Sequence, residues 1–276
     1  MESSLLHDTH MAINMAHRLV YFVPEAAEEY AALGVTGRGG YFASRAAPLG
    51  AATDALIIAT YYNFAPRAVH SAMAGVWGTT TPSALQDARF RTVVRSLDRI
   101  GFTMSSTDLD EARSIIDPVV AGLDYAGKPL AAANSAIVLP SDPLAALWQQ
   151  VTIIREWRGD AHISLLVAND IGPCECMVLQ VGTGRFPRAI TMATREWNES
   201  EWAQAIGVLN KRGWVDPEGA MTPEGIAARE AVENDTNRLC EPIWNNAGEA
   251  GLRRLSELIW PLHKAVEAAG TYAVLN

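Results

Sequence analysis

The sequence predicts a mainly α-helical protein. Apolar residues recur at three- and four-residue spacing along most of the chain, whereas the alternation typical of strands is almost absent. Glycine and proline interrupt these periodic stretches at short intervals, as they do between helices. Hydrophobic residues make up 49% and charged residues 19% of the 276 residues, so the chain has enough apolar surface to form a core and is not expected to be disordered.

The first half of the chain divides into short helices. Helical spacing begins at residue 12 and continues to 22, so the polar residues 1–10 are expected to be a frayed end. A run of glycines at 37, 39 and 40 predicts a turn. Helices are expected over residues 24–33, 51–62, 66–76, 83–100 and 108–123.

Residues 127–143 are the expected boundary between two domains. This segment contains three prolines and has no sustained periodicity. It therefore predicts a linker between an N-terminal helical domain, 1–126, and a C-terminal domain, 144–276.

The C-terminal domain contains a clear helix start. Asn198 precedes an apolar stripe and Glu201 follows three residues later, which is the spacing of a capping box. Trp202 and Leu209 share one face of the predicted helix, and Gly213 ends it.

A tight turn and a second capped helix follow. Residues 214–221 are two short extended pieces around an Asp-Pro-Glu-Gly turn, and Thr222 is placed to cap a helix that ends near residue 239. Over residues 197–241 this order resembles the second half of a MarR-type winged helix with its short β-wing. Helices expected at 143–157, 162–168 and 173–181 would supply the earlier part, and such winged-helix-like units can occur as duplicates. The alternative is a helical hairpin with a β-turn.

The winged-helix resemblance implies DNA binding, but the residues argue against it. A recognition helix uses Arg, Lys, Asn or Gln side chains to contact bases and phosphates. Here the helix begins with Glu199 and Glu201, and the wing carries Asp216 and Glu218. Because the formal net charge is also −9, nucleic acid is not the expected partner.

The densest group of chemically active side chains lies at residues 155–162, expected at the end of one helix and the start of the next. His162 and Asp160 are candidate acid–base residues, with Arg158 beside them, and Arg155 is a candidate for binding a carboxylate or phosphate. The alternative is a cluster of salt bridges and caps that holds a helix corner, with Asp160 capping the second helix.

A second group combines phenol, amide and guanidinium side chains among alanines. Tyr41 and Arg45 share one helical face, and Tyr62 and Asn63 lie at a helix end. Together with Arg155 they predict a pocket wall for a small anionic or carbonyl-bearing molecule. Ordinary helix packing with tyrosines at the rim is the alternative.

The sequence contains no clear motif for a metal site, a nucleotide-binding loop, a signal sequence or a membrane segment. There is no H-E-x-x-H or C-x-x-C motif and no glycine-rich nucleotide loop, so no metal is expected and no cofactor is named. Three cysteines, no signal sequence and no long apolar run indicate a cytoplasmic protein that does not enter a membrane. The apolar stripe of the last helix, residues 247–269, predicts a homodimer.

Longer sequence strings add a resemblance that spans nearly the whole chain. GYFASRAAPLG at 40–50, ATYYNFAP at 59–66 and REWRGDAH at 155–162 resemble an actinobacterial family known mainly by a helix-turn-helix label. The resemblance implies a DNA-binding ancestry and no specific activity. The leading hypothesis is a small-molecule-binding protein, including an enzyme of specialised metabolism, on a scaffold that no longer binds DNA. A ligand-responsive MarR-like regulator is the second hypothesis, and a non-catalytic scaffold protein the third.

Overall fold

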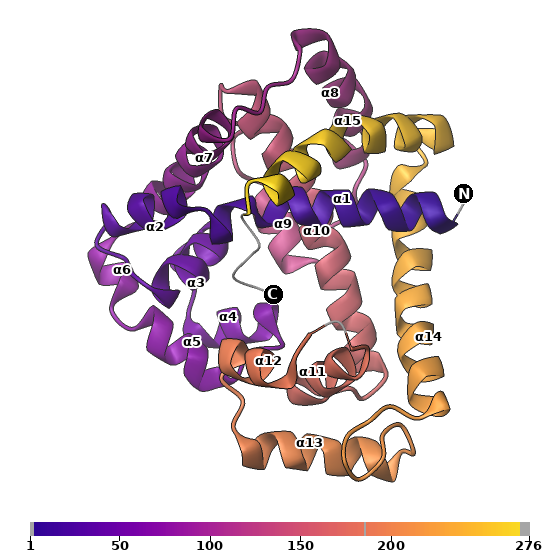
Figure 1. Cartoon of the computed structure of the whole chain (residues 1–276). Coiled ribbons are helices and arrows are strands. Elements are labelled where there is room, and N and C mark those ends of the chain that lie inside the picture. The colour runs from indigo at the N-terminus through magenta and orange to yellow at the C-terminus, as the bar shows by residue number, and fades with distance from the viewer. Residues whose placement is uncertain (1–2, 185, 271–276) are drawn as a thin grey trace. The chain divides into compact units, whose positions relative to one another are not determined.

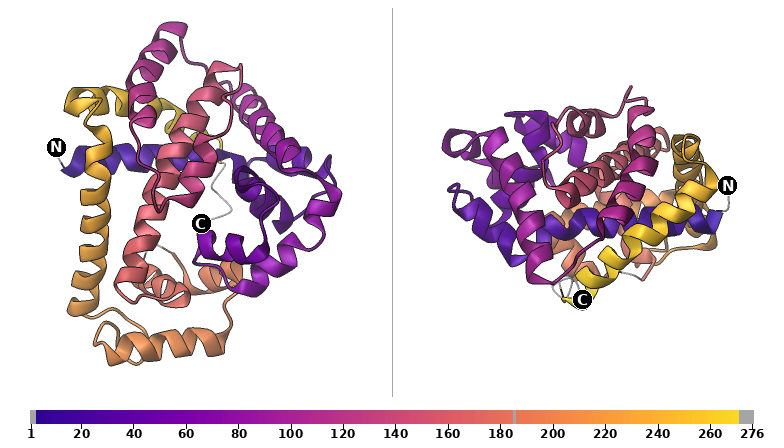
Figure 2. Two further views of the ribbon diagram at one scale, coloured as in Figure 1. Left: turned by 180° about the vertical axis from the view of Figure 1, so that it is seen from behind. Right: turned by 90° about the horizontal axis from the view of Figure 1, so that it is seen from above.

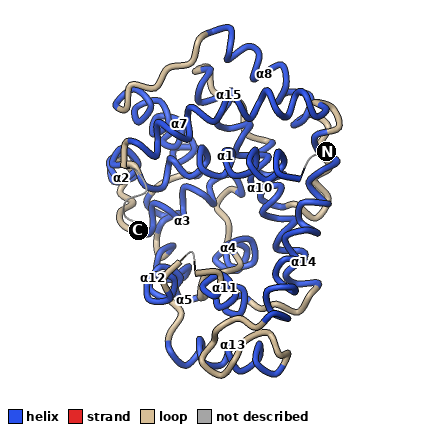
Figure 3. The backbone as a smooth tube through the Cα atoms, turned by 45° about the vertical axis from the view of Figure 1, so that its right-hand side comes forward, coloured by secondary structure: helices blue, strands red, loops and turns tan. Residues whose placement is uncertain are grey.

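The computed structural model describes residues 3–184 and 186–270, and throughout these residues the chain forms helices joined by loops (Figure 3). The mainly α-helical prediction is confirmed. The packing separates two compact units. The first comprises residues 1–52, 75–160 and 239–276, and the second comprises residues 53–74 and 161–238.

Helix α1 (Ser3–Phe22) corrects the expectation of a frayed end over residues 3–10, while residues 1–2 lie outside the described residues. The side chains of Leu5, Leu6, Thr9 and His10 are buried, and Thr9 donates a hydrogen bond to the carbonyl of Leu5 at 2.8 Å. Positions 5, 6 and 9 continue the spacing of the buried residues further along the helix. The polar residues between them conceal this periodicity in the sequence.

Helix α15 (Gly248–Ala268) packs along α1 inside the first unit (Figures 1 and 2). It also contacts α8 (Ser106–Ala121). The stripe that predicted a homodimer is therefore covered by helices of the same chain and offers no free surface for pairing. Its buried members are Leu252, Leu255, Leu258, Ile259, Leu262 and Val266.

The first unit also contains the segment expected to be a linker. Residues 127–143 include a helix, α9 (Pro129–Ser135), and the side chains of Leu130 and Ala131 are buried. Proline starts helices here instead of marking a boundary, since its fixed φ suits the first helical turn. The remaining elements of the unit are α2 (Pro24–Ala31), α3 (Arg38–Ala46), η1 (Ala47–Leu49), α6 (Val76–Thr79), α7 (Pro82–Arg99) and η2 (Glu241–Trp244).

Helix α10 (Pro143–Ala168) runs without a break through residues 155–162. The predicted helix corner is therefore wrong, and Asp160 does not cap a second helix there. Gly159 lies inside the helix, where a glycine costs about 1 kcal/mol relative to alanine but does not end it. The polar side chains of Gln149, Thr152 and Glu156 are buried, so much of this helix is surrounded by protein.

The second unit confirms the helix starts that the sequence predicts. The Glu201 N–H donates to Asn198 Oδ1 at 2.9 Å, and the Asn198 N–H donates to Glu201 Oε2 at 2.9 Å, so the capping box is formed. The Gly225 N–H donates to Thr222 Oγ1 at 3.1 Å. The elements are α4 (Asp54–Tyr61), α5 (Pro66–Met73), α11 (Pro173–Gly182), α12 (Arg188–Arg195), α13 (Glu199–Lys211) and α14 (Pro223–Cys240), the last of which ends in the first unit.

The expected β-wing is reduced to one bridge. Val215 and Met221 form an isolated antiparallel pair, and the described residues contain no strand. Between them, Asp216 Oδ1 accepts the N–H groups of Glu218 at 3.0 Å and Ala220 at 2.8 Å. The side chain thus satisfies backbone donors inside a short turn, where a longer ladder has no room to form.

Candidate ligand site

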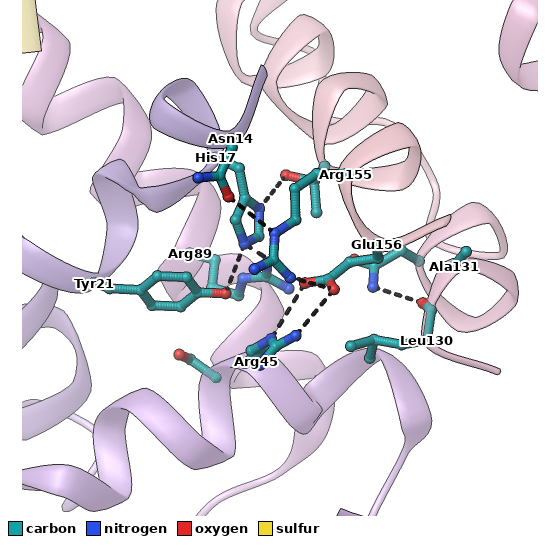
Figure 4. A network of polar contacts seen from close by, with 12 residues as sticks. Asn14, His17, Tyr21, Arg45, Arg89, Leu130, Ala131, Arg155 and Glu156 are labelled. Carbon is teal, nitrogen blue, oxygen red and sulfur yellow. Dashed lines mark hydrogen bonds and ion pairs between the residues drawn. The ribbon is translucent and has the colours of Figure 1, made fainter. Parts of the chain in front are cut away.

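Glu156 is the centre of a buried polar network in the first unit (Figure 4). It lies on α10 with 1% of its side chain exposed. Arg45 of α3 donates to both of its oxygens, from Nε at 3.2 Å and from Nη2 at 3.0 Å, and Arg155 Nη1 donates at 2.6 Å. Burial raises the pKa of Glu156, but the charges of Arg155 and Arg45 outweigh burial and hold that pKa well below its usual range. Glu156 is therefore a carboxylate at neutral pH.

His17 of α1 contacts this carboxylate as a neutral imidazole. Its Nδ1 lies 3.1 Å from Thr152 Oγ1 and its Nε2 lies 3.1 Å from Tyr21 Oη and 3.5 Å from Glu156 Oε1. Burial, followed by the charge of Arg155, lowers the pKa of His17 well below its ordinary value. The imidazole therefore adds no charge to the network, but it links two hydroxyl groups through hydrogen bonds.

Arg89 of α7 is a buried cation beside the same network. Its residue is 1% exposed, its Nη1 donates to Gln86 Oε1 at 3.1 Å, and its guanidinium lies 5.0 Å from the ring centroid of Trp148. The Nε atom has no hydrogen-bond partner, and no carboxylate of the described residues forms an ion pair with Arg89. Leaving a cation in this state is costly, because burial removes its hydration without supplying a counter-charge.

We call Arg45, Arg89 and Arg155 together the arginine cluster; their side chains converge around Glu156 in Figure 4. All three charges lower the pKa of His17, which shows that they act on the same region. Arg155 has 26% of its side chain exposed and gives the cluster access to solvent. Three guanidinium groups around one carboxylate suit the binding of an anion.

Aromatic and amide side chains complete the surroundings of the arginine cluster. Arg45 Nη1 donates to Tyr41 Oη at 3.5 Å, and the rings of Tyr41 and Tyr21 meet edge-to-face with centroids 4.8 Å apart. Arg155 Nε donates to Asn14 Oδ1 at 3.4 Å. The predicted binding residues Tyr41, Arg45 and Arg155 are thus neighbours in the structure.

Asp160 holds the start of another helix. Its Oδ2 accepts the backbone N–H of Leu130 at 3.0 Å and of Ala131 at 2.9 Å, in the first turn of α9. Burial raises the pKa of Asp160 to about 6, in spite of these hydrogen bonds. The carboxylate therefore caps the start of α9 from a distant part of the chain. The sequence predicted an acid–base role for Asp160 and did not predict this cap.

Asp160 is expected to make stability fall as pH rises from about 4 to about 6. The folded protein binds this proton more tightly than the unfolded chain, whose pKa is near 3.8, so the contribution of the proton is lost through that window. Asp160→Asn keeps an oxygen for the two N–H groups and removes the charge. It should raise the free energy of unfolding at pH 8 by roughly 1–3 kcal/mol and flatten the pH profile.

Urea unfolding at pH 4.5 and pH 8 measures this effect, with Asp160→Ala as the control. Because alanine removes the acceptor, this variant should lose stability at both pH values. A wild-type pH slope in Asp160→Asn would contradict the assignment.

Three predicted residues belong to the second unit. Tyr62 ends α4 with a φ of 51°, and its hydroxyl donates to the carbonyl of Ile171 at 2.5 Å. Trp197 Nε1 donates to the carbonyl of Asn63 at 3.1 Å, and His162 Nδ1 lies 3.0 Å from Thr236 Oγ1. Tyr62 and His162 therefore have side-chain partners within their own unit, whereas Asn63 is bonded through its backbone carbonyl and its buried Oδ1 has no hydrogen-bond partner.

Arg158 lies in the first unit and acts on a different histidine. Burial, followed by the charge of Arg158, lowers the pKa of His10 to about 3. Arg158 is thus placed near α1, and its predicted partner His162 belongs to the other unit.

Sequence reasoning did not select His17, Tyr21 or Arg89 as site residues. A signal for two of them is present, however. Arg89 falls on the buried face of α7 with Leu85 and Thr92, and His17 falls on the buried face of α1. A charged residue at an apolar position of a helix is a marker of a buried polar site.

In the described part of the chain, no group of three or more His, Cys, Asp or Glu residues is arranged to hold a metal ion. None of the described helices is both long enough and apolar enough to cross a membrane.

Comparison with known proteins gives a family and nothing closer. A family model described as a helix-turn-helix family matches residues 7–273. No curated protein and no solved structure matches the chain.

Proposed function

We propose that this chain, which belongs to the helix-turn-helix family, binds a small anionic molecule at the arginine cluster of its first unit. The observation that carries the proposal is Arg89, a buried cation that forms no ion pair with a carboxylate of the described residues. An uncompensated charge in a protein interior costs several kcal/mol, and an anionic ligand would offset that cost.

The chemistry of the cluster favours a carboxylate, phosphate or polarised carbonyl. Guanidinium groups form paired hydrogen bonds with such oxygens, and the phenol rings of Tyr21 and Tyr41 add aromatic surface. His17, neutral and hydrogen-bonded to Tyr21, adds an uncharged hydrogen-bonding group. The proposal therefore covers a binding protein and an enzyme of specialised metabolism alike.

The charges of the second unit do not favour duplex DNA as the main partner. Residues 161–238 contain eleven Asp and Glu residues against seven Lys and Arg residues. Arg188 pairs with Glu199 on α13, and Arg212 donates to the carbonyls of Asn169 and Asp170. Cations used in this way add little to the attraction of phosphates that supplies non-specific DNA affinity.

A ligand-responsive regulator is the second candidate, and membership of a helix-turn-helix family favours it. In that case the same anion would control DNA binding. Both candidates bind the anion, and only the regulator also binds duplex DNA. Measurements of anion binding and of DNA binding on one preparation therefore distinguish them.

The test combines a thermal-shift screen with a gel shift. A panel of small carboxylates and phosphates should raise the melting temperature by roughly 5–10 °C for a ligand at 100 times its Kd. In a gel shift against a pool of random duplexes at physiological salt, we expect no sequence-dependent retardation. Sequence-dependent retardation that the ligand relieves would establish the regulator instead, and an unchanged melting temperature throughout the panel would contradict both candidates.

A further inference from the structure

The start of α1 lies over two buried aromatic side chains of the first unit whose polar atoms are not hydrogen-bonded. His10 of α1 is 7% exposed and Trp244 of η2 is fully buried, and their ring centroids are 5.9 Å apart. Among the described residues, neither ring nitrogen of His10 has a hydrogen-bond partner, and Trp244 Nε1 has none either. Buried polar side chains are normally hydrogen-bonded, so this contact carries an unusual cost.

The segment that covers this pair is the first part of a helix that is held more firmly further on. The side chains of residues 5, 6, 9 and 10 are buried, whereas those of residues 7 and 8 are exposed. Beyond this segment, Trp148 Nε1 donates to the carbonyl of Ala16 at 3.2 Å, and His17 contacts Thr152. The ends of helices open locally at the lowest free energy, and opening here would give three buried polar atoms access to water.

The charges around His10 oppose its protonation in the closed segment. Burial is the main cause that lowers the pKa of His10 to about 3, and the charges of Arg158 on α10 and His7 on α1 lower it further. No carboxylate in the described parts of α1, η2 or α15 raises this pKa. Cys240, at the end of α14, is an uncharged thiol, because burial raises its pKa to about 11. A proton on the buried imidazole would therefore have no counter-charge.

We propose that residues 3–10 form an acid-released latch, which is closed over Trp244 while His10 is neutral and opens when His10 binds a proton. In the open segment the imidazole is hydrated and regains its ordinary pKa, near 6.5, so the open form binds one proton more than the closed form. The equilibrium constant for opening should then increase about 10-fold for each pH unit below about pH 6. A histidine in this position responds to mild acid, as histidines do in pH-sensitive proteins.

The latch does not depend on the ligand site proposed above, because His10 and Trp244 are not among the residues of the arginine cluster. Its effect is conformational, since opening exposes the indole of Trp244 and the apolar side chains of Leu5 and Leu6 to solvent. A protein that lacks anion binding could still have the latch, and the converse also holds.

Hydrogen exchange followed by mass spectrometry at pH 7 and pH 5 tests the latch on the full chain, with exposure times scaled to the intrinsic exchange rate at each pH. The amides of residues 7–10 should open roughly 25-fold more often at pH 5, as expected for one proton with a pKa near 6.5 in the open form. Helix α7 of the same unit should stay protected at exposure times at which the latch has exchanged.

His10→Phe removes the titrating group and keeps an aromatic ring against Trp244. In this variant, opening should differ by less than about 2-fold between the two pH values. His10→Leu is a second variant with the same expectation and a smaller side chain. His7→Gln is the matched control, because His7 is an exposed histidine of the same segment, and this variant should keep the pH dependence of the wild type.

Three results would overturn the latch. The first is wild-type exchange of residues 7–10 with the same opening constant at both pH values. The second is exchange of α7 in parallel with the latch at pH 5, which would mean that the unit unfolds as a whole. The third is a pH dependence that persists in His10→Phe and His10→Leu, or that is lost in His7→Gln, which would assign the response to a group other than His10.

Discussion

Glu156→Gln is expected to lower the free energy of unfolding by about 3–5 kcal/mol, since removing one partner of a buried ion pair leaves the other charge uncompensated. In the wild type this carboxylate is the partner of both Arg45 and Arg155. The substitution preserves the shape of the side chain and removes its charge, so three buried or partly buried cations would then lie close together. Urea unfolding at pH 7 measures the loss.

An exposed pair of the same geometry is the matched control. Glu111 accepts from Arg254 Nε at 2.9 Å and from Arg254 Nη2 at 2.7 Å, but their side chains are 40% and 41% exposed. Glu111→Gln should therefore lower the free energy of unfolding much less than Glu156→Gln does, because solvent screens the exposed pair. Equal losses in the two variants would show that burial of the Glu156 pair does not determine its contribution.

The features that sequence reasoning predicted well are local ones. The capping box of Asn198 and Glu201, and the cap at Thr222, depend on residues three apart, so their pattern is visible along the chain. Helical periodicity likewise identifies α13 and α15. The same periodicity does not tell what covers an apolar stripe, which is why the stripe of α15 was assigned to a dimer and proved to pack on α1.

The features that sequence reasoning missed depend on tertiary contacts. Asp160 was expected to cap the helix that follows it, but its carboxylate holds the N–H groups of residues that lie about thirty positions earlier. His17 and Thr152 are 135 residues apart in the sequence and 3.1 Å apart in the fold. Tyr41, Arg45 and Arg155 were selected as binding residues because of their chemistry, and Glu156, which brings the two arginines together, was given no role.

Arg89→Met in the ligand-free protein is expected to have the opposite sign to Glu156→Gln. Three effects compete at this position. The variant loses the hydrogen bond to Gln86, worth about 1 kcal/mol, and the contact with the Trp148 ring, worth up to about 2 kcal/mol when desolvated. It also relieves the burial of a cation without a counter-charge, which costs several kcal/mol.

The last effect should prevail, because methionine keeps an apolar side chain of similar length against Trp148. We therefore expect the free energy of unfolding to rise by about 1–2 kcal/mol, within the range found when buried charges are replaced by apolar residues. Arg45→Met is the matched control. It removes the bidentate partner of Glu156 and should lower stability, so two arginine-to-methionine substitutions in one cluster should differ in sign.

Addition of an anionic ligand should then reverse the order of stability of wild type and Arg89→Met. Wild-type protein gains the binding free energy, whereas the variant has lost the cation that the ligand neutralises and gains little. Urea unfolding of both proteins with and without succinate or methyl phosphate measures this change in their order of stability. A loss of stability in ligand-free Arg89→Met would mean that Arg89 is already compensated within the fold, and the buried cation would then no longer argue for a ligand.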